Sequence, residues 1–294
     1  MKKVLVTGAT GYIGRRVVAL LGRMDDVKVL TLSRNTEKAY ELMTYGNVEH
    51  IGAEEWGRVK EYKPDVVLHL ATYSTSGDSE EIIEKLIMSN IMYGTQLLNA
   101  LQGCGDMLFV NVGSFAEYRL GLDKGFRDAY LYTATKSAFR HVVDYYADKC
   151  GFRYVTAVPY TVYGGVDTGK KLIDYMVDSI DSEEPVKMTK GEQVLDFVHV
   201  EDVARFFAAM VEHSEVIENR HEFHLGTCVG TRVRDLAEII SREIGQKLNI
   251  EWGGREYRPL DVMYAVAPRD EYLNRYWKAE ISIKEGVNEK LTCR

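Results

Sequence analysis

Residues 4–14 read VLVTGATGYIG, and this stretch decides the fold. A β-branched strand runs into a glycine-rich turn, and a helical pattern follows it. Gly8 permits the tight turn, Gly11 lets the backbone approach a pyrophosphate, and Gly14 lets the helix pack closely on the sheet. The helix N-terminus then faces the anion, so the stretch predicts a dinucleotide-binding loop. Its expected cofactor contacts are Gly8, Thr10, Gly11, Tyr12, Ile13 and Gly14.

The 294 residues include 37 Lys and Arg against 44 Asp and Glu, which gives a formal net charge of −7. This acidic balance argues against nucleic acid or an anionic membrane surface as a partner. Two glycines interrupt the N-terminal apolar stretch, and later apolar runs fall far short of the roughly 20 residues that span a bilayer. The four cysteines form no CxxC pair: they are Cys104, Cys150, Cys228 and Cys293. We expect a cytoplasmic protein without a metal site.

Strand-like and helical patterns alternate over the first 164 residues. The expected strands are Val4–Thr7, Lys28–Leu32, Asp65–Leu70, Met107–Val112 and Tyr154–Val158. The expected helices are Tyr12–Leu21, Thr36–Met43, a long stretch ending at Leu101, and Tyr132–Lys149. Repeated strand and helix predict parallel strands with crossovers on both faces of one sheet. The fold class is therefore α/β, with a doubly wound Rossmann-type sheet over residues 1–164.

The alternation loosens after residue 164. Helical patterns remain at Lys170–Ser182, Val203–Glu212 and Val233–Ile244, with strand-like pieces around Val186, Phe197, Phe223 and Ile250. We expect residues 165–294 to form a smaller lobe, with some of the chain crossing back to the sheet. No Pro- or Ser-rich linker separates the two parts, so we expect the lobe to pack on the sheet.

The second strand ends in Ser33 and Arg34, at the distance from the glycine loop where an acidic side chain would hold the ribose 2′-hydroxyl of NAD. That acid is missing. A hydroxyl and a guanidinium are suited to binding a 2′-phosphate, so the sequence favours NADP over NAD. Two other interpretations of Arg34 stay open: a solvated loop cation, or a cation that stacks on adenine without discriminating.

Tyr132 and Lys136 stand four residues apart on an expected helix, and hence on one face. A cation beside a phenol stabilises the phenolate, which fits the phenol for acid–base work at neutral pH. Ser114 follows a buried strand at the sheet edge where ligands gather in open α/β folds. Its hydroxyl is placed to bind a substrate carbonyl, although a helix-capping serine would look the same.

These motifs together resemble an extended short-chain dehydrogenase/reductase of the nucleotide-sugar epimerase, dehydratase and reductase branch. The resemblance covers the chain almost from end to end. The matching segments are TGATGYIG at residues 7–14, HLAT at 69–72, NIMYGT at 90–95, Ser114 with Tyr118, Tyr132 with Lys136, VYG at 162–164, DFVHVEDVA at 196–204 and RPLD at 258–261.

The resemblance implies roles for residues in both parts of the chain. Ser114 and Tyr132 would grip the reacting oxygen, while Lys136 would hold the nicotinamide ribose and lower the pKa of the tyrosine. Further cofactor contacts would come from Leu70, Ala71, Thr72, Pro159 and Val162. The lobe would bind substrate, and the substrate contacts would be Ser74, Phe115, Thr161 and Arg258, with the arginine a candidate for the nucleotide diphosphate or a plain surface cation.

Departures from the family pattern narrow the reaction. Phe115 and Ala116 stand where a 4,6-dehydratase carries an Asp-Glu pair, so dehydration is disfavoured. Ala116 also replaces the cysteine of the epimerase/reductase of the GDP-fucose synthase type. Val158, Thr161 and Leu195 replace residues that relatives use for phosphate and sugar, which points to a remodelled substrate site.

The preferred hypothesis is NADPH-dependent reduction of a nucleotide-linked 4-keto-6-deoxy sugar, with Tyr132 as proton donor. The alternatives are a nucleotide-sugar 4-epimerase with tightly bound NAD, a reductase of non-nucleotide ketones or aldehydes, and a non-catalytic NADP-sensing protein. The His221 and His224 pair lacks a third ligand and the spacing of a metal site. The resemblance further implies a homodimer through helices at Asn90–Leu101 and Tyr132–Lys149.

Overall fold

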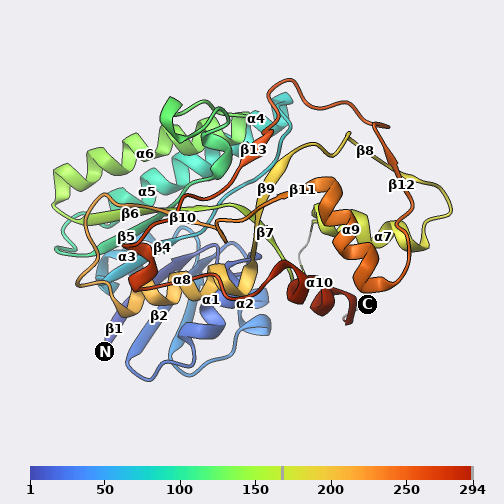
Figure 1. The fold of residues 1–294 in the computed structure, drawn as a ribbon. Coiled ribbons are helices and arrows are strands. Elements are labelled where there is room, and N and C mark those ends of the chain that lie inside the picture. Colours follow the sequence, from blue (N-terminus) through green and yellow to red (C-terminus); the bar gives the residue numbers. More distant parts are fainter. Residues whose placement is uncertain (167–168, 293–294) are drawn as a thin grey trace.

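The computed structural model describes residues 1–166 and 169–292, which leaves Cys293 outside the described residues (Figure 1). A seven-stranded sheet dominates the first half of the chain. In spatial order its strands are β10 (Glu222–Leu225), β6 (Arg153–Pro159), β5 (Leu108–Val112), β4 (Val66–His69), β1 (Lys2–Thr7), β2 (Val27–Ser33) and β3 (Val48–Gly52). All neighbouring strands are parallel, and the order reverses between β1 and β4. Ligands bind at such a reversal in open α/β sheets.

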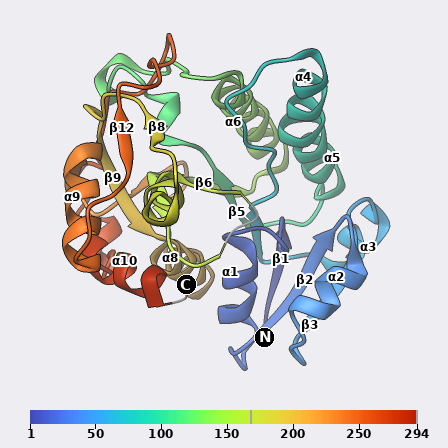
Figure 2. The same ribbon diagram turned by 90° about the vertical axis from the view of Figure 1, so that its right-hand side faces the viewer.

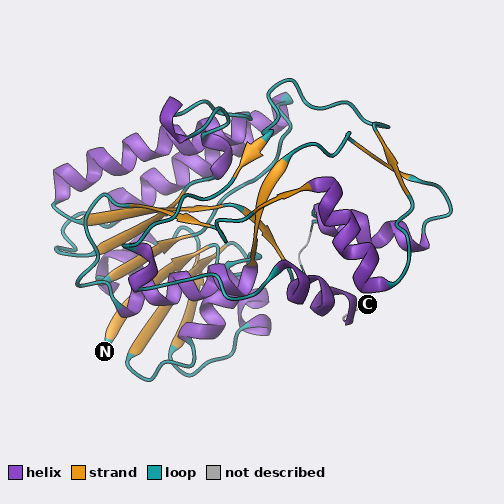
Figure 3. Cartoon of the chain, viewed as in Figure 1, coloured by secondary structure: helices purple, strands orange, loops and turns teal. Residues whose placement is uncertain are grey.

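Helices cover both faces of this sheet, as Figure 3 shows. One face packs against α1 (Gly14–Leu21), α2 (Thr36–Leu42) and α8 (Val200–Glu212). The other packs against α3 (Trp56–Tyr62), α5 (Tyr93–Ala100) and α6 (Leu131–Cys150). The arrangement confirms the expected doubly wound α/β class.

The smaller lobe lies beside the sheet and has an apolar core of its own (Figure 2). Strand β9 (Val194–His199) pairs with β7 (Thr161–Tyr163), β11 (Gly230–Arg232) and β13 (Tyr264–Ala265). The remaining elements are α7 (Leu172–Asp178), β8 (Val186–Met188), α9 (Val233–Ile244), β12 (Ile250–Trp252) and α10 (Ile283–Thr292). The second half of the chain also returns to the main sheet, because β10 pairs with β6 and α8 packs on α1.

Two expected elements differ in the structure. The long helical stretch ending near Leu101 consists of α4 (Glu80–Ile87), a π-helical turn at Met88–Met92, and α5. The turn places the buried Asn90 against the loop after β4, and its side chain hydrogen-bonds that loop and α6. The first helix begins at Gly14 and not at Tyr12, because the preceding residues form the glycine loop.

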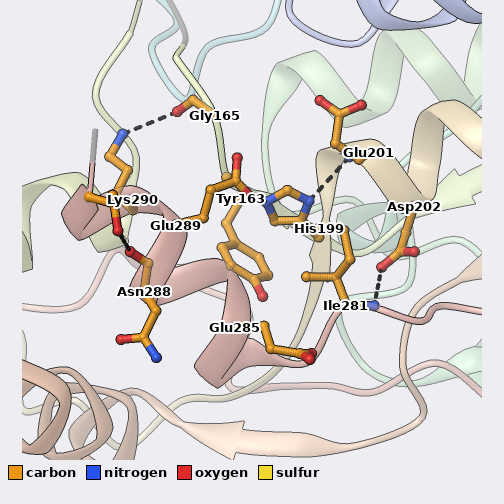
Figure 4. A network of polar contacts seen from close by, with 12 residues as sticks. Tyr163, Gly165, His199, Glu201, Asp202, Ile281, Glu285, Asn288, Glu289 and Lys290 are labelled. Carbon is orange, nitrogen blue, oxygen red and sulfur yellow. Dashed lines mark hydrogen bonds and ion pairs between the residues drawn. The ribbon is translucent and has the colours of Figure 1, made fainter. Parts of the chain in front are cut away.

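Helix α10 docks on the ends of β7 and β9 (Figure 4). Gly286 lies against the rings of Tyr163 and His199, where any side chain would overlap them. Lys290 donates to the carbonyl of Gly165 at 3.2 Å. The end of the chain is thereby fixed beside the segment that follows β7.

None of the helices in the described ranges combines the length and apolar character needed to cross a membrane.

A buried carboxylate, Asp196 in β9, joins the lobe to the main sheet. It accepts hydrogen bonds from the backbone N–H groups of Thr227 (2.8 Å), Cys228 (2.8 Å) and Ala267 (3.2 Å). The loop after β10 and the segment after β13 are therefore tied to one side chain.

Replacing Asp196 by alanine should destabilise the protein by about 2–4 kcal/mol, because three N–H groups lose their acceptor in a buried place. The free energy of unfolding in urea measures this. Asp148→Ala is the control, since Asp148 is exposed and paired with Arg220, and it should cost less than about 1 kcal/mol. Equal costs for the two variants would contradict the proposed role of Asp196.

Candidate functional site

The glycine loop lies against the chain that leaves β4, at the reversal of strand order. Gly8 has φ +70°, and a Cβ there would come within 2.6 Å of the backbone nitrogen of Ala71. The hydroxyl of Thr7 accepts from the N–H of Ala71 at 3.1 Å and lies 2.9 Å from Nδ1 of His69. A Cβ at Gly14 would overlap the carbonyl of Gly8. Only glycine suits Gly8 and Gly14, and the cradle fits a dinucleotide pyrophosphate.

The other expected loop residues have separate placements. Gly11 is exposed, and its N–H donates to the carbonyl of Gly8 at 3.0 Å. Thr10 is half-buried in the turn, and Ile13 packs on the core beneath. The hydroxyl of Tyr12 donates to the carbonyl of Gly164 at 2.5 Å, which links the loop to the segment after β7.

Ser33 and Arg34 lie at the carboxyl end of β2, on the same sheet edge as the glycine loop. The hydroxyl of Ser33 is buried and has no hydrogen-bond partner among the described residues. Arg34 is exposed, and Asn35 beside it caps α2 by accepting from the N–H of Lys38 at 2.8 Å. An unpaired hydroxyl beside an exposed guanidinium fits a ribose phosphate.

Tyr132 and Lys136 share one face of α6, as predicted. The ammonium of Lys136 lies 5.9 Å from the centre of the Tyr132 ring, and the lysine is 4% exposed. Burial raises the pKa of Tyr132 to about 12 and Glu117 adds to the rise, while hydrogen bonds with Thr72 and Ser74 oppose it. Burial lowers the pKa of Lys136 to about 8. The phenol is therefore protonated at neutral pH, and the ammonium loses its proton in mildly alkaline solution.

Ser114 has the local contact of a capping serine. Its hydroxyl oxygen accepts from the N–H of Ala116 at 3.3 Å, at the start of the short 3₁₀ helix Phe115–Glu117. The hydroxyls that bind the Tyr132 phenol come instead from Thr72 and Ser74. Ser114 still has its own proton to donate, because the cap uses a lone pair of its oxygen.

Sequence analysis assigned Thr72 to the cofactor and Ser74 to the substrate, but not to the phenol. The contact arises because the loop after β4 is held against α6. Thr72 donates to Oδ1 of Asn90 at 3.0 Å, and Nδ2 of Asn90 donates to the hydroxyl of Thr135 on α6 at 3.0 Å. The signal in the sequence was the position of both hydroxyls directly after a strand of the sheet.

The remaining expected cofactor residues lie at strand ends along this edge. Leu70 and Ala71 follow β4, Pro159 ends β6, and Val162 lies in β7 and packs on the main core. Two expected substrate residues also border the edge: Phe115 stacks on Tyr160 with ring centres 5.7 Å apart, and the hydroxyl of Thr161 is buried without a partner among the described residues.

Arg258 lies near the start of α6, although it is far from it in sequence. Its guanidinium lies 5.6 Å from the ring centre of Tyr130, whose hydroxyl donates to Asp261 at 3.1 Å. The arginine is exposed. It is therefore available to an anion beside the catalytic helix.

The histidines near β10 bind different acids. His221 lies 3.1 Å from Asp270, and His224 lies 2.8 Å from Glu222. Glu222 also belongs to a cluster with Glu117 and Arg140 that sequence analysis missed.

Comparison with known proteins identifies the family. Residues 4–226 match the NAD dependent epimerase/dehydratase family. The chain belongs to this family. Membership confirms the resemblance to extended short-chain dehydrogenases and the expectation of an NAD(P)-dependent enzyme.

Similar proteins cover almost the whole chain. The CDP-abequose synthase of Yersinia pseudotuberculosis is 27% identical over 98% of this chain and 99% of its own length. The CDP-abequose synthase of Salmonella typhimurium is 25% identical over 98% of this chain and 97% of its own. The UDP-glucose 4-epimerase of Thermus thermophilus, solved in complex with NAD, has a TM-score of 0.81 at 22% identity over 99% of this chain and 98% of its own. That last likeness concerns the fold.

Alanine variants at Gly11 and Gly14 should separate cofactor binding from folding. At Gly11 the nearest atom to a Cβ is the Gly8 oxygen at 3.1 Å, so the fold should tolerate Gly11→Ala while the methyl group obstructs the pyrophosphate. We expect dinucleotide affinity to fall about tenfold with little change in Tm.

Gly14→Ala should instead lower Tm, because its methyl group overlaps the Gly8 carbonyl. Calorimetric titration and thermal melts measure the two effects. The assignment fails if Gly11→Ala binds dinucleotide as the native protein does.

Proposed function

We propose that the protein is an NADPH-dependent reductase of a nucleotide-linked 4-keto-6-deoxy sugar. The observation that carries the proposal is the Tyr132 and Lys136 pair on the edge that the glycine loop and Arg34 share. The relatives named CDP-abequose synthase span the whole chain, which supports a sugar-nucleotide substrate and makes a CDP-linked sugar the first to test.

The residues of this chain would divide the work at the reacting oxygen. NADPH supplies a hydride to the keto carbon. Tyr132 then gives its proton to the developing alkoxide, and Ser114 donates a hydrogen bond to the same oxygen. Lys136 keeps a positive charge beside the phenol, which eases loss of the phenolic proton.

The titration of this pair sets the direction of the pH dependence. Reduction needs Tyr132 protonated and Lys136 charged. Because the pKa of Tyr132 is about 12 and that of Lys136 about 8, activity should be present at neutral pH and fall as the pH rises through the lower value. The loss on the alkaline side would reflect deprotonation of the lysine.

The environment of the positions after Ser114 disfavours dehydration. Phe115 stacks on Tyr160, and Ala116 is buried. The next residue, Glu117, is an acid, but it is buried and paired with Arg140. It is thus unsuited to act as an acid or base on a sugar.

A 4-epimerase with tightly bound NAD is the second candidate. It is favoured by the fold shared with solved 4-epimerases, such as the UDP-N-acetylglucosamine 4-epimerase of Methanobrevibacter ruminantium M1 (TM-score 0.82, 21% identity, 100% of this chain and 99% of that chain). The missing acid after β2 favours the reductase. Extraction of the purified protein distinguishes them, because retained NAD would indicate the epimerase and dissociable NADPH the reductase.

Two alternatives remain for the same test. Val158, Thr161 and Leu195 would suit a non-nucleotide ketone or aldehyde, and an NADP sensor would bind the cofactor without turnover. Turnover with nucleotide sugars counts against both.

A homodimer through residues 90–101 of η1 and α5 and through α6 remains part of the proposal. It is supported by apolar side chains exposed on and beside these helices, among them Met88, Met92 and Tyr145. Sedimentation of the purified protein measures its mass.

Arg34→Asp should reverse the cofactor preference. The new carboxylate repels a 2′-phosphate and accepts from a ribose hydroxyl, so NADPH affinity should fall about tenfold or more while NADH affinity rises. Calorimetric titration with each dinucleotide measures this, with Arg15→Asp on α1 as a control for the added charge. Unchanged relative affinities would defeat the NADP assignment.

Tyr132→Phe should lower kcat by about 10²–10⁴-fold, because the proton donor is lost, and leave NADPH affinity near the native value. The rate of NADPH oxidation with CDP-, dTDP-, GDP- and UDP-linked 4-keto-6-deoxy sugars measures turnover. Tyr175→Phe, a change at an exposed tyrosine, is the control. Retained turnover in Tyr132→Phe would refute the mechanism.

A further inference from the structure

A buried charged cluster continues the face of α6 that carries the catalytic pair. Arg140 follows Lys136 by one helical turn, so Tyr132, Lys136 and Arg140 lie in one row. The guanidinium of Arg140 binds Glu117 from the 3₁₀ helix after Ser114 and Glu222 from β10. We call Glu117, Arg140 and Glu222 the charge cluster.

Glu117 is the innermost member of the charge cluster. Its side chain is fully buried, and one carboxylate oxygen, Oε1, has no hydrogen-bond partner in the part of the chain that the structure describes. Gly113 makes room for the pair, because a Cβ there would overlap the Arg140 guanidinium. The carboxylate is thus held in a place where an isolated charge is costly.

Glu222 closes the outer side of the charge cluster. Its carboxylate accepts from the hydroxyl of Tyr118 at 2.6 and 2.7 Å, and Nε2 of His224 lies 2.8 Å away. Burial opposes ionisation of Glu222, but His224, Arg140 and Tyr118 lower its pKa to about 2. Glu117 and Glu222 raise the pKa of Arg140 against the effect of burial. Glu222 and Arg140 are therefore charged at every working pH.

The charge cluster adjoins Lys136. Burial and the positive charge of Arg140 both lower the pKa of Lys136, and Glu117 is the anion that opposes them. His69 also faces the lysine, but burial lowers its pKa to about 3, so it is neutral. Tyr132, the remaining neighbour, is neutral as well at neutral pH.

We propose that Glu117 is a positioning residue of the reaction, which keeps Lys136 protonated beside Tyr132 and is itself held in place by Arg140. A pair with only a packing role needs no charge, since apolar side chains of similar volume fill such a space at no loss of stability in many proteins. The carboxylate here offsets two unfavourable influences on the lysine, namely its burial and the neighbouring arginine.

The test measures Lys136 directly, without the reaction. Competitive labelling with acetic anhydride over a range of pH, read by peptide mass spectrometry, gives the pH at which Lys136 is half protonated in the full-length protein. Glu117→Gln removes the charge and keeps the shape, and should lower this midpoint by about one pH unit or more. Glu117→Asp keeps the charge, and its midpoint should stay near the native one.

Two further variants guard the result. Glu222→Gln leaves Arg140 less neutralised from a partly exposed position, so it should lower the midpoint in the same direction by a smaller amount, and it serves if Glu117→Gln does not fold. Glu49→Gln, which removes an exposed carboxylate paired with Arg58, should leave the midpoint unchanged.

The catalytic consequence rests on the proposed reductase function. The alkaline limb of the pH profile of kcat/KM should move to lower pH in Glu117→Gln and stay in place in Glu117→Asp. A normal labelling midpoint for Lys136 in Glu117→Gln, or in Glu222→Gln if the first variant is unfolded, overturns the proposal. A shifted midpoint without any NADPH-dependent turnover in the native protein would support the lysine role and count against the reductase instead.

Discussion

The structure depends on how closely the glycine loop approaches the chain leaving β4. Gly8 lies against Ala71, and Gly14 lies against Gly8, at distances that exclude a Cβ. This contact brings the ends of β1 and β4 together at the reversal of strand order, where the sheet leaves a crevice for a ligand. The same contact fixes the start of the loop that carries Thr72 and Ser74 to the phenol of Tyr132. Cofactor cradle and reaction centre are thus two sides of one backbone junction.

Burial works against both catalytic groups on α6. It favours the neutral form of a phenol and of an amine alike, so a lysine beside a tyrosine helps the reaction only while something keeps the lysine charged. An exposed ion pair would be too weak for this, because water screens it. The fully buried Glu117, braced by Arg140, supplies a negative charge near Lys136 that water does not screen. The helix therefore carries its own electrostatic support one turn beyond the reacting pair.

Local patterns in the sequence predicted the doubly wound sheet, the glycine loop and the face shared by Tyr132 and Lys136. The patterns succeed where the relevant residues are neighbours along one strand, turn or helix. The charge cluster escaped prediction because Arg140 is 23 residues from Glu117 and 82 from Glu222. These groups meet only because β10 returns to pair with β6, a long-range event without a local signature. Similarly, the π-helical turn at Met88–Met92 reflects the tertiary contact of Asn90 and not a change in helical periodicity.

The lobe and the cofactor loop are mechanically connected, which gives the second half of the chain a part in the first site. Tyr12 of the loop donates to the carbonyl of Gly164, and Lys290 of α10 donates to the carbonyl of the next residue, Gly165 (Figure 4). Lys290 also pairs with Asp174 on α7. A dinucleotide that orders the loop around Tyr12 would therefore stabilise the backbone between the sheet and the lobe. Because the lobe borders the strand ends at which the hydride must meet its acceptor, the position of the substrate depends on the same few hydrogen bonds that hold the end of the chain.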